Sequence, residues 1–302
     1  MNEANTRTFM QNEARQTKGA SVGIPPRMMQ FNVPDGTAKY PFFDGNQLGC
    51  SFFCVLSGIF PPGERFFVES VRHYRKEVKG EKLKAQVSGF IGQEAIHGKE
   101  HEHLNEWFQA QGYDVAMADR MIRFSLGLLE KLPPAQQIAC TTLMEHFTAH
   151  LAEQWLTNKV FRNSTDPEMI KLWSWHALEE LEHKAVVFDV HEQISKNPHL
   201  ERLLAVPLVA GALLPGIFFS WAWITLRHKD KQSLKAHRHG FKILFGRGGF
   251  IRRVLAPMPT YFAKDFHPDQ HDTAELEKHT RELFFGKQGT LKQHWKNKPA
   301  VA

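Results

Sequence analysis

Residues 173–184 read WSWHALEELEHK, and within them Glu180 precedes His183 by three positions. The upstream stretch QEAIH repeats this spacing with Glu94 and His97. Residues three apart lie on one face of an α-helix, so each pair can present a carboxylate oxygen and an imidazole nitrogen to one point. Two such pairs on two helices are the pattern that decides the fold.

Two further glutamates, Glu64 and Glu145, alternate with these pairs along the chain. The order is therefore Glu, Glu-x-x-His, Glu, Glu-x-x-His, which is the ligand set of ferritin-like di-iron bundles. A bundle interior excludes ionisable groups unless pairing or metal coordination compensates their charge. The alternative is solvated helix faces, where such pairs contribute only about 0.2–0.5 kcal/mol each. We predict an all-α protein, a ferritin-like four-helix bundle with a crossover helix and additional C-terminal helices.

The donor types also indicate the metal. Carboxylates combined with imidazoles favour iron, with manganese as the alternative, over an ion that prefers thiolates. We predict two iron ions, held by six side chains: Glu64, Glu94, His97, Glu145, Glu180 and His183.

Apolar periodicity and helix breakers set the expected elements. Pro61-Pro62-Gly63 is interpreted as the start of a helix, and Asp166-Pro167 as an N-cap followed by a first-turn proline. The expected helices span 48–60, 64–78, 82–111, 115–132, 135–161 and 167–195. We expect three regions: a flexible N-terminal tail (1–40), the di-metal bundle (41–200), and an apolar segment with a basic helical region packed on or beside the bundle (201–302).

The chain contains 17 histidines, and three of them fall near the predicted ligands. His101 follows one helical turn after His97, and His176 lies one turn before Glu180. If their two helices are antiparallel, His101 and His176 share one level, within about 7 Å of each other. His150 is expected near the same layer. This layer supplies either additional ligands, a third metal site, or hydrogen bonds that orient the carboxylates.

At these motifs the sequence resembles the bacterial family labelled "predicted metal-dependent hydrolase". The resemblance covers roughly residues 40–285 and implies a metal-binding helical protein. The word hydrolase in that label is itself a prediction, so the resemblance implies no particular reaction. The matching stretches are PGERFF (62–67), FIGQEAIH (90–97), EHFTA (145–149), WSWHALEELEHK (173–184) and DFHP (265–268).

Three functions remain open for such a centre. The first is a non-haem di-iron oxidoreductase that activates dioxygen, takes electrons from a donor and oxidises a hydrophobic, acyl or lipid substrate within an apolar bundle. Arylamine N-oxygenases with an added histidine ligand are a distant comparison, resting on ligand pattern alone. The second is a hydrolase that uses a metal-activated water. The third is non-catalytic metal binding or storage. We expect the first.

The stretch from Leu203 to Leu226 contains no charged side chain and is long enough for a membrane span. Pro207 and Pro215 interrupt it, so we expect shallow, bent contact with a membrane surface, with a buried core helix as the alternative. The basic residues that follow suit a lipid headgroup layer.

The amino-acid composition indicates the kind of partner and the cellular compartment to expect. The formal charge is +6, yet the chain carries no nucleic-acid-binding module or phosphate-binding loop, and we expect no nucleic-acid partner. Three cysteines give no disulfide framework. We therefore expect a cytoplasmic protein, peripheral or monotopic at the inner face of the membrane.

Overall fold

The computed structural model describes residues 18–32, 45–158 and 166–298. Within these ranges the chain is helical, and the only β-type pairing is an isolated bridge between Met29 and Trp295. The prediction of an all-α protein is confirmed.

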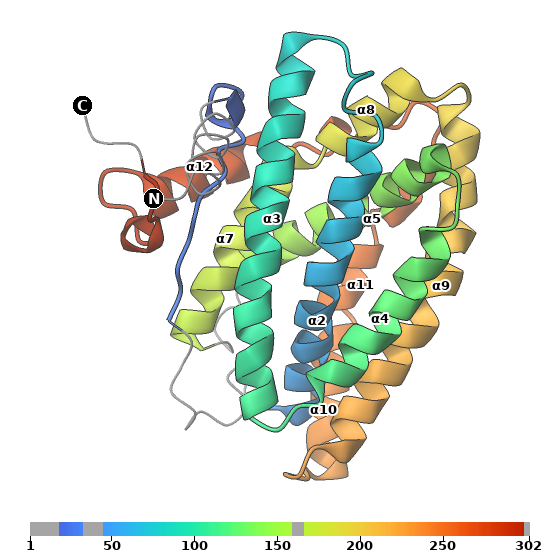
Figure 1. Ribbon diagram of the computed structural model, residues 1–302. Coiled ribbons are helices and arrows are strands. Elements are labelled where there is room, and N and C mark those ends of the chain that lie inside the picture. Colours follow the sequence, from blue (N-terminus) through green and yellow to red (C-terminus); the bar gives the residue numbers. More distant parts are fainter. Residues whose placement is uncertain (1–17, 33–44, 159–165, 299–302) are drawn as a thin grey trace, which may run out of the picture.

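Four helices carry the six predicted ligands: α2 (Gln47–Arg72), α3 (Glu81–Ala110), α5 (Pro134–Thr157) and α7 (Pro167–His183). α2 packs along α3, and α5 packs along α7 (Figure 1). The crossover helix α4 (Val115–Leu129) lies between α2 and α9 (Pro198–Arg227). This arrangement is consistent with a ferritin-like bundle. The remaining elements are α8 (Val186–Ile194), α10 (Leu234–Phe245), α11 (Phe250–Leu255), α12 (Ala274–Phe285) and 3₁₀ turns at Met258–Phe262, Pro268–Gln270 and Lys292–His294.

The helix α2 runs through Pro61 and Pro62, which corrects the prediction that these prolines start a new helix. Proline has no N–H, so Pro61 leaves the carbonyl of Ser57, four residues earlier, without its helical partner. The side chain of Asn105 on α3 donates a hydrogen bond to that carbonyl over 3.2 Å. A tertiary contact thus replaces the lost helical bond, and the helix continues.

The segment predicted as one helix over 167–195 is divided into α7 and α8. Its start is as predicted: a carboxylate oxygen of Asp166 accepts hydrogen bonds from the backbone N–H groups of Glu168 and Met169, and proline occupies the first turn. Its end is not, because α7 stops at His183. The next residue, Lys184, is buried and donates from Nζ to the backbone carbonyl of His271 and to Thr273 Oγ1, both at 2.7 Å.

Residues 18–32 pack against the bundle, although they fall in the predicted flexible tail; residues 1–17 and 33–44 lie outside the described ranges. Two glycines of α3 permit this close approach. A Cβ atom at Gly92 would lie 2.4 Å from the ring of Pro26, and one at Gly89 would lie 2.5 Å from the carbonyl of Ile24. The approach buries Arg27, which directly follows Pro26 in this segment.

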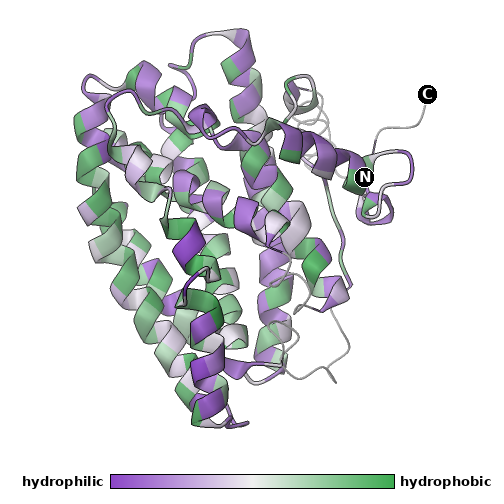
Figure 2. Ribbon diagram, turned by 180° about the vertical axis from the view of Figure 1, so that it is seen from behind, coloured by the Kyte–Doolittle hydropathy of each residue, from purple (hydrophilic) through white to green (hydrophobic). Residues whose placement is uncertain are grey.

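Among the described residues, α9 is the only helix long and apolar enough to cross a membrane. It packs against α4 and α5, yet only 28% of its most apolar stretch is buried. Figure 2 shows the hydrophobic colouring along this outer helix. The described residues therefore leave most of this stretch uncovered, unlike the predicted alternative of a buried core helix. Exposed apolar side chains of α9 include Leu204, Leu214, Phe218, Phe219 and Leu226.

Candidate metal centre

The bundle brings all six predicted ligands into its interior, where each is at most 4% exposed. They come from α2 (Glu64), α3 (Glu94 and His97), α5 (Glu145) and α7 (Glu180 and His183).

The first group of donors surrounds His183. Its Nε2 atom lies 3.1 Å from Glu94 Oε1, 3.5 Å from Glu145 Oε2 and 3.7 Å from Glu180 Oε2. One donor atom each of Glu94, Glu180 and His183 fall within 4.8 Å of one another, which is close enough to share a metal ion.

The second group joins Glu64, His97 and His176, whose donor atoms also lie within 4.8 Å of one another. Glu180 lies between the two groups. Its Oε1 is 2.8 Å from His176 Nε2 and 3.7 Å from His97 Nδ1, while its Oε2 faces His183. A carboxylate in this position can contribute one oxygen to each of two metal ions.

The electrostatics of the centre fit bound cations. Both carboxylate oxygens of Glu64, Glu94 and Glu145 are buried without a hydrogen-bond partner, as is the Nδ1 atom of His97. Burial, together with neighbouring carboxylates, raises the pKa of Glu64 and Glu145 well above the usual range, and burial raises the pKa of Glu94 to about 7. Buried carboxylates without hydrogen-bond partners are costly, and metal coordination removes that cost. The donor set therefore fits two metal ions.

The two Glu-x-x-His motifs support each other. In each motif, one ring nitrogen of the histidine contacts the side chain that directly precedes the glutamate of the other motif. His97 Nε2 is 3.0 Å from Glu179 Oε2, and His183 Nδ1 is 3.1 Å from Gln93 Oε1. Such hydrogen bonds fix the tautomer and ring orientation of metal-binding histidines. The reciprocal pattern was not predicted. Its signal in the sequence is a polar side chain directly before each Glu-x-x-His.

Arg27 connects these supporting groups and was also missed. Its guanidinium contacts Glu179 Oε1 at 2.7 Å and both oxygens of Glu182 at 2.8 Å. Glu182 also receives hydrogen bonds from Gln93 and Arg281, each at 2.9 Å. Burial raises the pKa of Glu182, but Arg27 and Arg281 outweigh it and the net pKa is lowered, so this carboxylate is charged.

His101 and His176 lie together as predicted, with His101 Nε2 2.7 Å from His176 Nδ1 in the bundle interior. The second nitrogen of His101 is 2.9 Å from Ser57 Oγ. Because both nitrogens of His101 have protein partners, its geometry suits orientation of His176. His176 presents Nε2 to the carboxylates, so its geometry suits a ligand.

His150 does not join this layer, which corrects the prediction. It follows Glu145 by five residues, so on a helix of 3.6 residues per turn it lies about 140° around α5 from the ligand face. It instead contacts the rings of His146 and His271, at centroid separations of 4.5 and 4.7 Å.

Gly98 on α3 provides a test of the second donor group. A Cβ atom there would lie 2.9 Å from Glu64 Oε2, so Gly98→Ala is expected to displace this carboxylate and lower metal content by up to one ion per chain. Elemental analysis of the purified variant measures this. Gly211→Ala is the control, because nothing lies within 4 Å of its Cβ. Unchanged metal content in Gly98→Ala would contradict the expected displacement of Glu64 from a metal ion.

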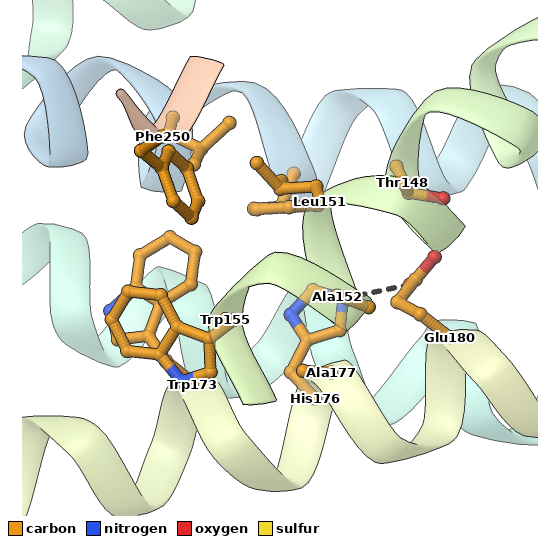
Figure 3. Close-up of a pocket in the computed structure, with 11 residues that line it drawn as sticks. Thr148, Leu151, Ala152, Trp155, Trp173, His176, Ala177, Glu180 and Phe250 are labelled. Atoms are coloured by element: carbon orange, nitrogen blue, oxygen red, sulfur yellow. Dashed lines mark hydrogen bonds and ion pairs between the residues drawn. The ribbon is translucent and has the colours of Figure 1, made fainter. Parts of the chain in front are cut away.

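A small pocket beside the centre is lined by residues of α2, α5, α7 and α11 (Figure 3). Its inner end is formed by His176 and Glu180, and its walls are mainly apolar and aromatic. The free space is about 20 Å³, room for about one water molecule. Wall residues include Phe60, Leu151, Trp155, Trp173 and Phe250.

Comparison with known proteins identifies the family. The model of a family described as "Predicted metal-dependent hydrolase" matches residues 25–272, a range that contains every residue of the centre. No curated protein and no solved structure matches the chain. The family assignment overturns the prediction of a dioxygen-activating oxidoreductase with an electron donor, and favours its alternative, hydrolysis. By its sequence over most of its length, the chain belongs to the family of predicted metal-dependent hydrolases.

Proposed function

We propose that this protein hydrolyses an apolar substrate, such as an acyl ester, at a dinuclear metal centre in the bundle. The observation that carries the proposal is the pocket, whose apolar walls end at His176 and Glu180. In the structure the pocket has room for about one water molecule beside these groups, so an acyl substrate would enter only after its aromatic side chains move apart. The family assignment supports hydrolysis as the reaction class.

The proposed ligands form two sets that share Glu180. Glu94, Glu145 and His183 would hold one ion together with Glu180, and Glu64, His97 and His176 would hold the other. Oxygen and imidazole donors suit iron or manganese. When bound, such ions supply Lewis acidity and lower the pKa of a coordinated water to near neutrality.

The protein contributes proton placement and exclusion of bulk water. Burial lowers the pKa of His101 well below its usual range, so its ring is neutral. Ser57, His101 and His176 form a hydrogen-bonded row whose inner end, His176 Nε2, is 2.8 Å from Glu180. When His176 carries its proton on Nδ1, that N–H donates a hydrogen bond to His101 Nε2. The other ring nitrogen, His176 Nε2, is then unprotonated and can bind a metal ion. The aromatic walls orient the apolar part of the substrate and limit solvent access.

The proposal predicts ester hydrolysis that depends on metal and not on dioxygen. Chelator-stripped protein should be inactive toward a series of acyl esters and regain activity anaerobically with Fe²⁺ or Mn²⁺, with KM falling as the acyl chain lengthens because apolar burial is favourable. Product analysis in ¹⁸O-labelled water checks the origin of the incorporated oxygen. Glu180→Gln should be inactive, whereas Glu102→Gln, on the exposed face of α3, should retain activity. A fully metal-loaded protein without turnover would contradict hydrolysis and favour non-catalytic metal binding.

A second part of the proposal concerns location: α9 lies against a membrane surface and places the bundle near an acyl or lipid substrate. Exposed apolar side chains continue from α9 into α10 at Leu234 and Phe241. The same end of the molecule carries exposed basic side chains, among them Arg227, Lys229, Lys231, Lys235, Arg238 and Lys242. An apolar surface of this size calls for a covering partner, and the adjacent positive charge favours anionic lipid.

Co-sedimentation with liposomes tests this location. The intact protein should pellet with anionic vesicles at low salt, because each basic contact contributes about 1 kcal/mol near such a surface. Phe218→Ser/Phe219→Ser should weaken binding at both low and high salt, whereas Lys229→Ala/Lys231→Ala should weaken it mainly at low salt. Phe124→Ser, an exposed aromatic on α4, is the control. Protein that remains in the supernatant with every vesicle would contradict membrane contact.

A further inference from the structure

A second cluster of metal-binding side chains lies outside the bundle centre. His150 and Glu153 are three residues apart on α5, and His271 follows the 3₁₀ turn Pro268–Gln270. One donor atom from each falls within 4.8 Å of the others. Glu153 Oε2 is 2.9 Å from His271 Nε2 and 3.8 Å from His150 Nδ1. We propose that these three residues form a third metal site, of the two-histidine, one-carboxylate type, for a divalent ion such as zinc.

The unpartnered state of His150 is the independent observation that points to a ligand. This side chain is 3% exposed, and neither of its ring nitrogens forms a hydrogen bond. Buried polar groups in folded proteins nearly always have a partner, and an ion bound between His150 and Glu153 would provide one. The neighbouring His146 also has a buried Nε2 without a partner, and its ring lies against His150.

The donor set matches zinc chemistry. Zinc accepts imidazole nitrogen and carboxylate oxygen, and two histidines with one glutamate leave a fourth position for water. Access from solvent is available, because the side chains of His271 and Glu153 are 41% and 25% exposed. The interactions of Glu153 with His150 and His271 outweigh burial and lower the pKa of this carboxylate.

The proposed third site lies apart from the bundle centre, and an ion bound there would connect different parts of the chain. On α5, His150 lies about 140° and Glu153 about 80° around the helix from Glu145, and His271 belongs to the connection before α12. The backbone carbonyl of His271 accepts a hydrogen bond from Lys184, the residue directly after His183. An ion at this site would therefore fix the connection to α5 beside the end of α7.

Metal counting in matched variants tests the proposal independently of hydrolysis. After equilibration with Zn²⁺ and removal of the excess, the full-length protein should hold one equivalent more than His271→Ala or Glu153→Gln. His267→Ala is the control: it removes a similarly exposed histidine of the same connection, one that pairs with Asp189. Glu180→Ala, which targets the bundle centre, should retain this equivalent.

Cobalt provides the spectroscopic counterpart. In the Glu180→Ala background, Co²⁺ should give visible absorption typical of a four-coordinate site, and His271→Ala should abolish it. Equal zinc content in wild-type protein and His271→Ala would overturn the proposal. Loss of the same zinc equivalent in His267→Ala would also overturn the proposal, because it would show that any substitution in this connection disturbs zinc binding.

Discussion

Glu180→Ala is expected to remove both metal ions from the bundle centre, because Glu180 has one oxygen directed to each donor group. Glu94→Ala, His97→Ala and His183→Ala should each remove at least one ion. Loss of a residue that only hydrogen-bonds to a metal ligand lowers activity by about 10–100-fold. Loss of a ligand itself should lower the rate of hydrolysis by more than that. Elemental analysis and a circular dichroism spectrum measure the two quantities that matter, metal content and helicity.

Helicity should be largely retained in these four variants, since each removes a buried ionisable group that has incomplete protein partners. Glu102→Ala on the exposed face of α3 is the matched control for a lost glutamate. Full metal occupancy in all four variants would end the dinuclear interpretation.

Arg27→Met is expected to cause the largest loss of stability among single substitutions at the centre. It leaves Glu179 and Glu182, both fully buried, without their shared cation. Removal of one partner from a buried ion pair costs about 3–5 kcal/mol. Metal affinity should also fall by about 10–100-fold, because Glu179 orients His97.

Arg281→Met is the matched control for this prediction. Arg281 also contacts Glu182, but its side chain is 39% exposed, and Arg27 would still neutralise the carboxylate. Chemical denaturation of the two variants gives the comparison, and Arg27→Met/Glu182→Gln should recover part of the lost stability. A loss in Arg27→Met no greater than that in Arg281→Met would contradict the role assigned to Arg27.

Local sequence rules predicted most of the helices, because caps, breakers and periodicity act within a few residues. Asp166 and Pro167 begin α7 as expected. The proximity of His101 to His176 was also predictable, since it requires only helical spacing and opposite chain directions. The gathering of the six candidate ligands in one buried place follows from the same spacing.

Features that depend on contacts distant in sequence could not be predicted. The helix α2 continues through Pro61 because Asn105, on another helix, bonds to the carbonyl that proline leaves free. The burial of Arg27 depends on the missing side chains of Gly89 and Gly92. Glu153 meets His271, 118 positions later, and no local pattern connects the two. The proposed reaction class, hydrolysis, rests on the family assignment, because the same donor set supports several chemistries.

The most direct test of the dinuclear centre is anomalous X-ray diffraction from crystals of protein loaded with Fe²⁺ or Mn²⁺, collected at the absorption edge of the metal. We expect two anomalous peaks inside the bundle, about 3.5–4 Å apart, with Glu180 between them. One peak should lie against His183 and the other against His97. Loaded crystals with no anomalous peak among these side chains would contradict the dinuclear centre.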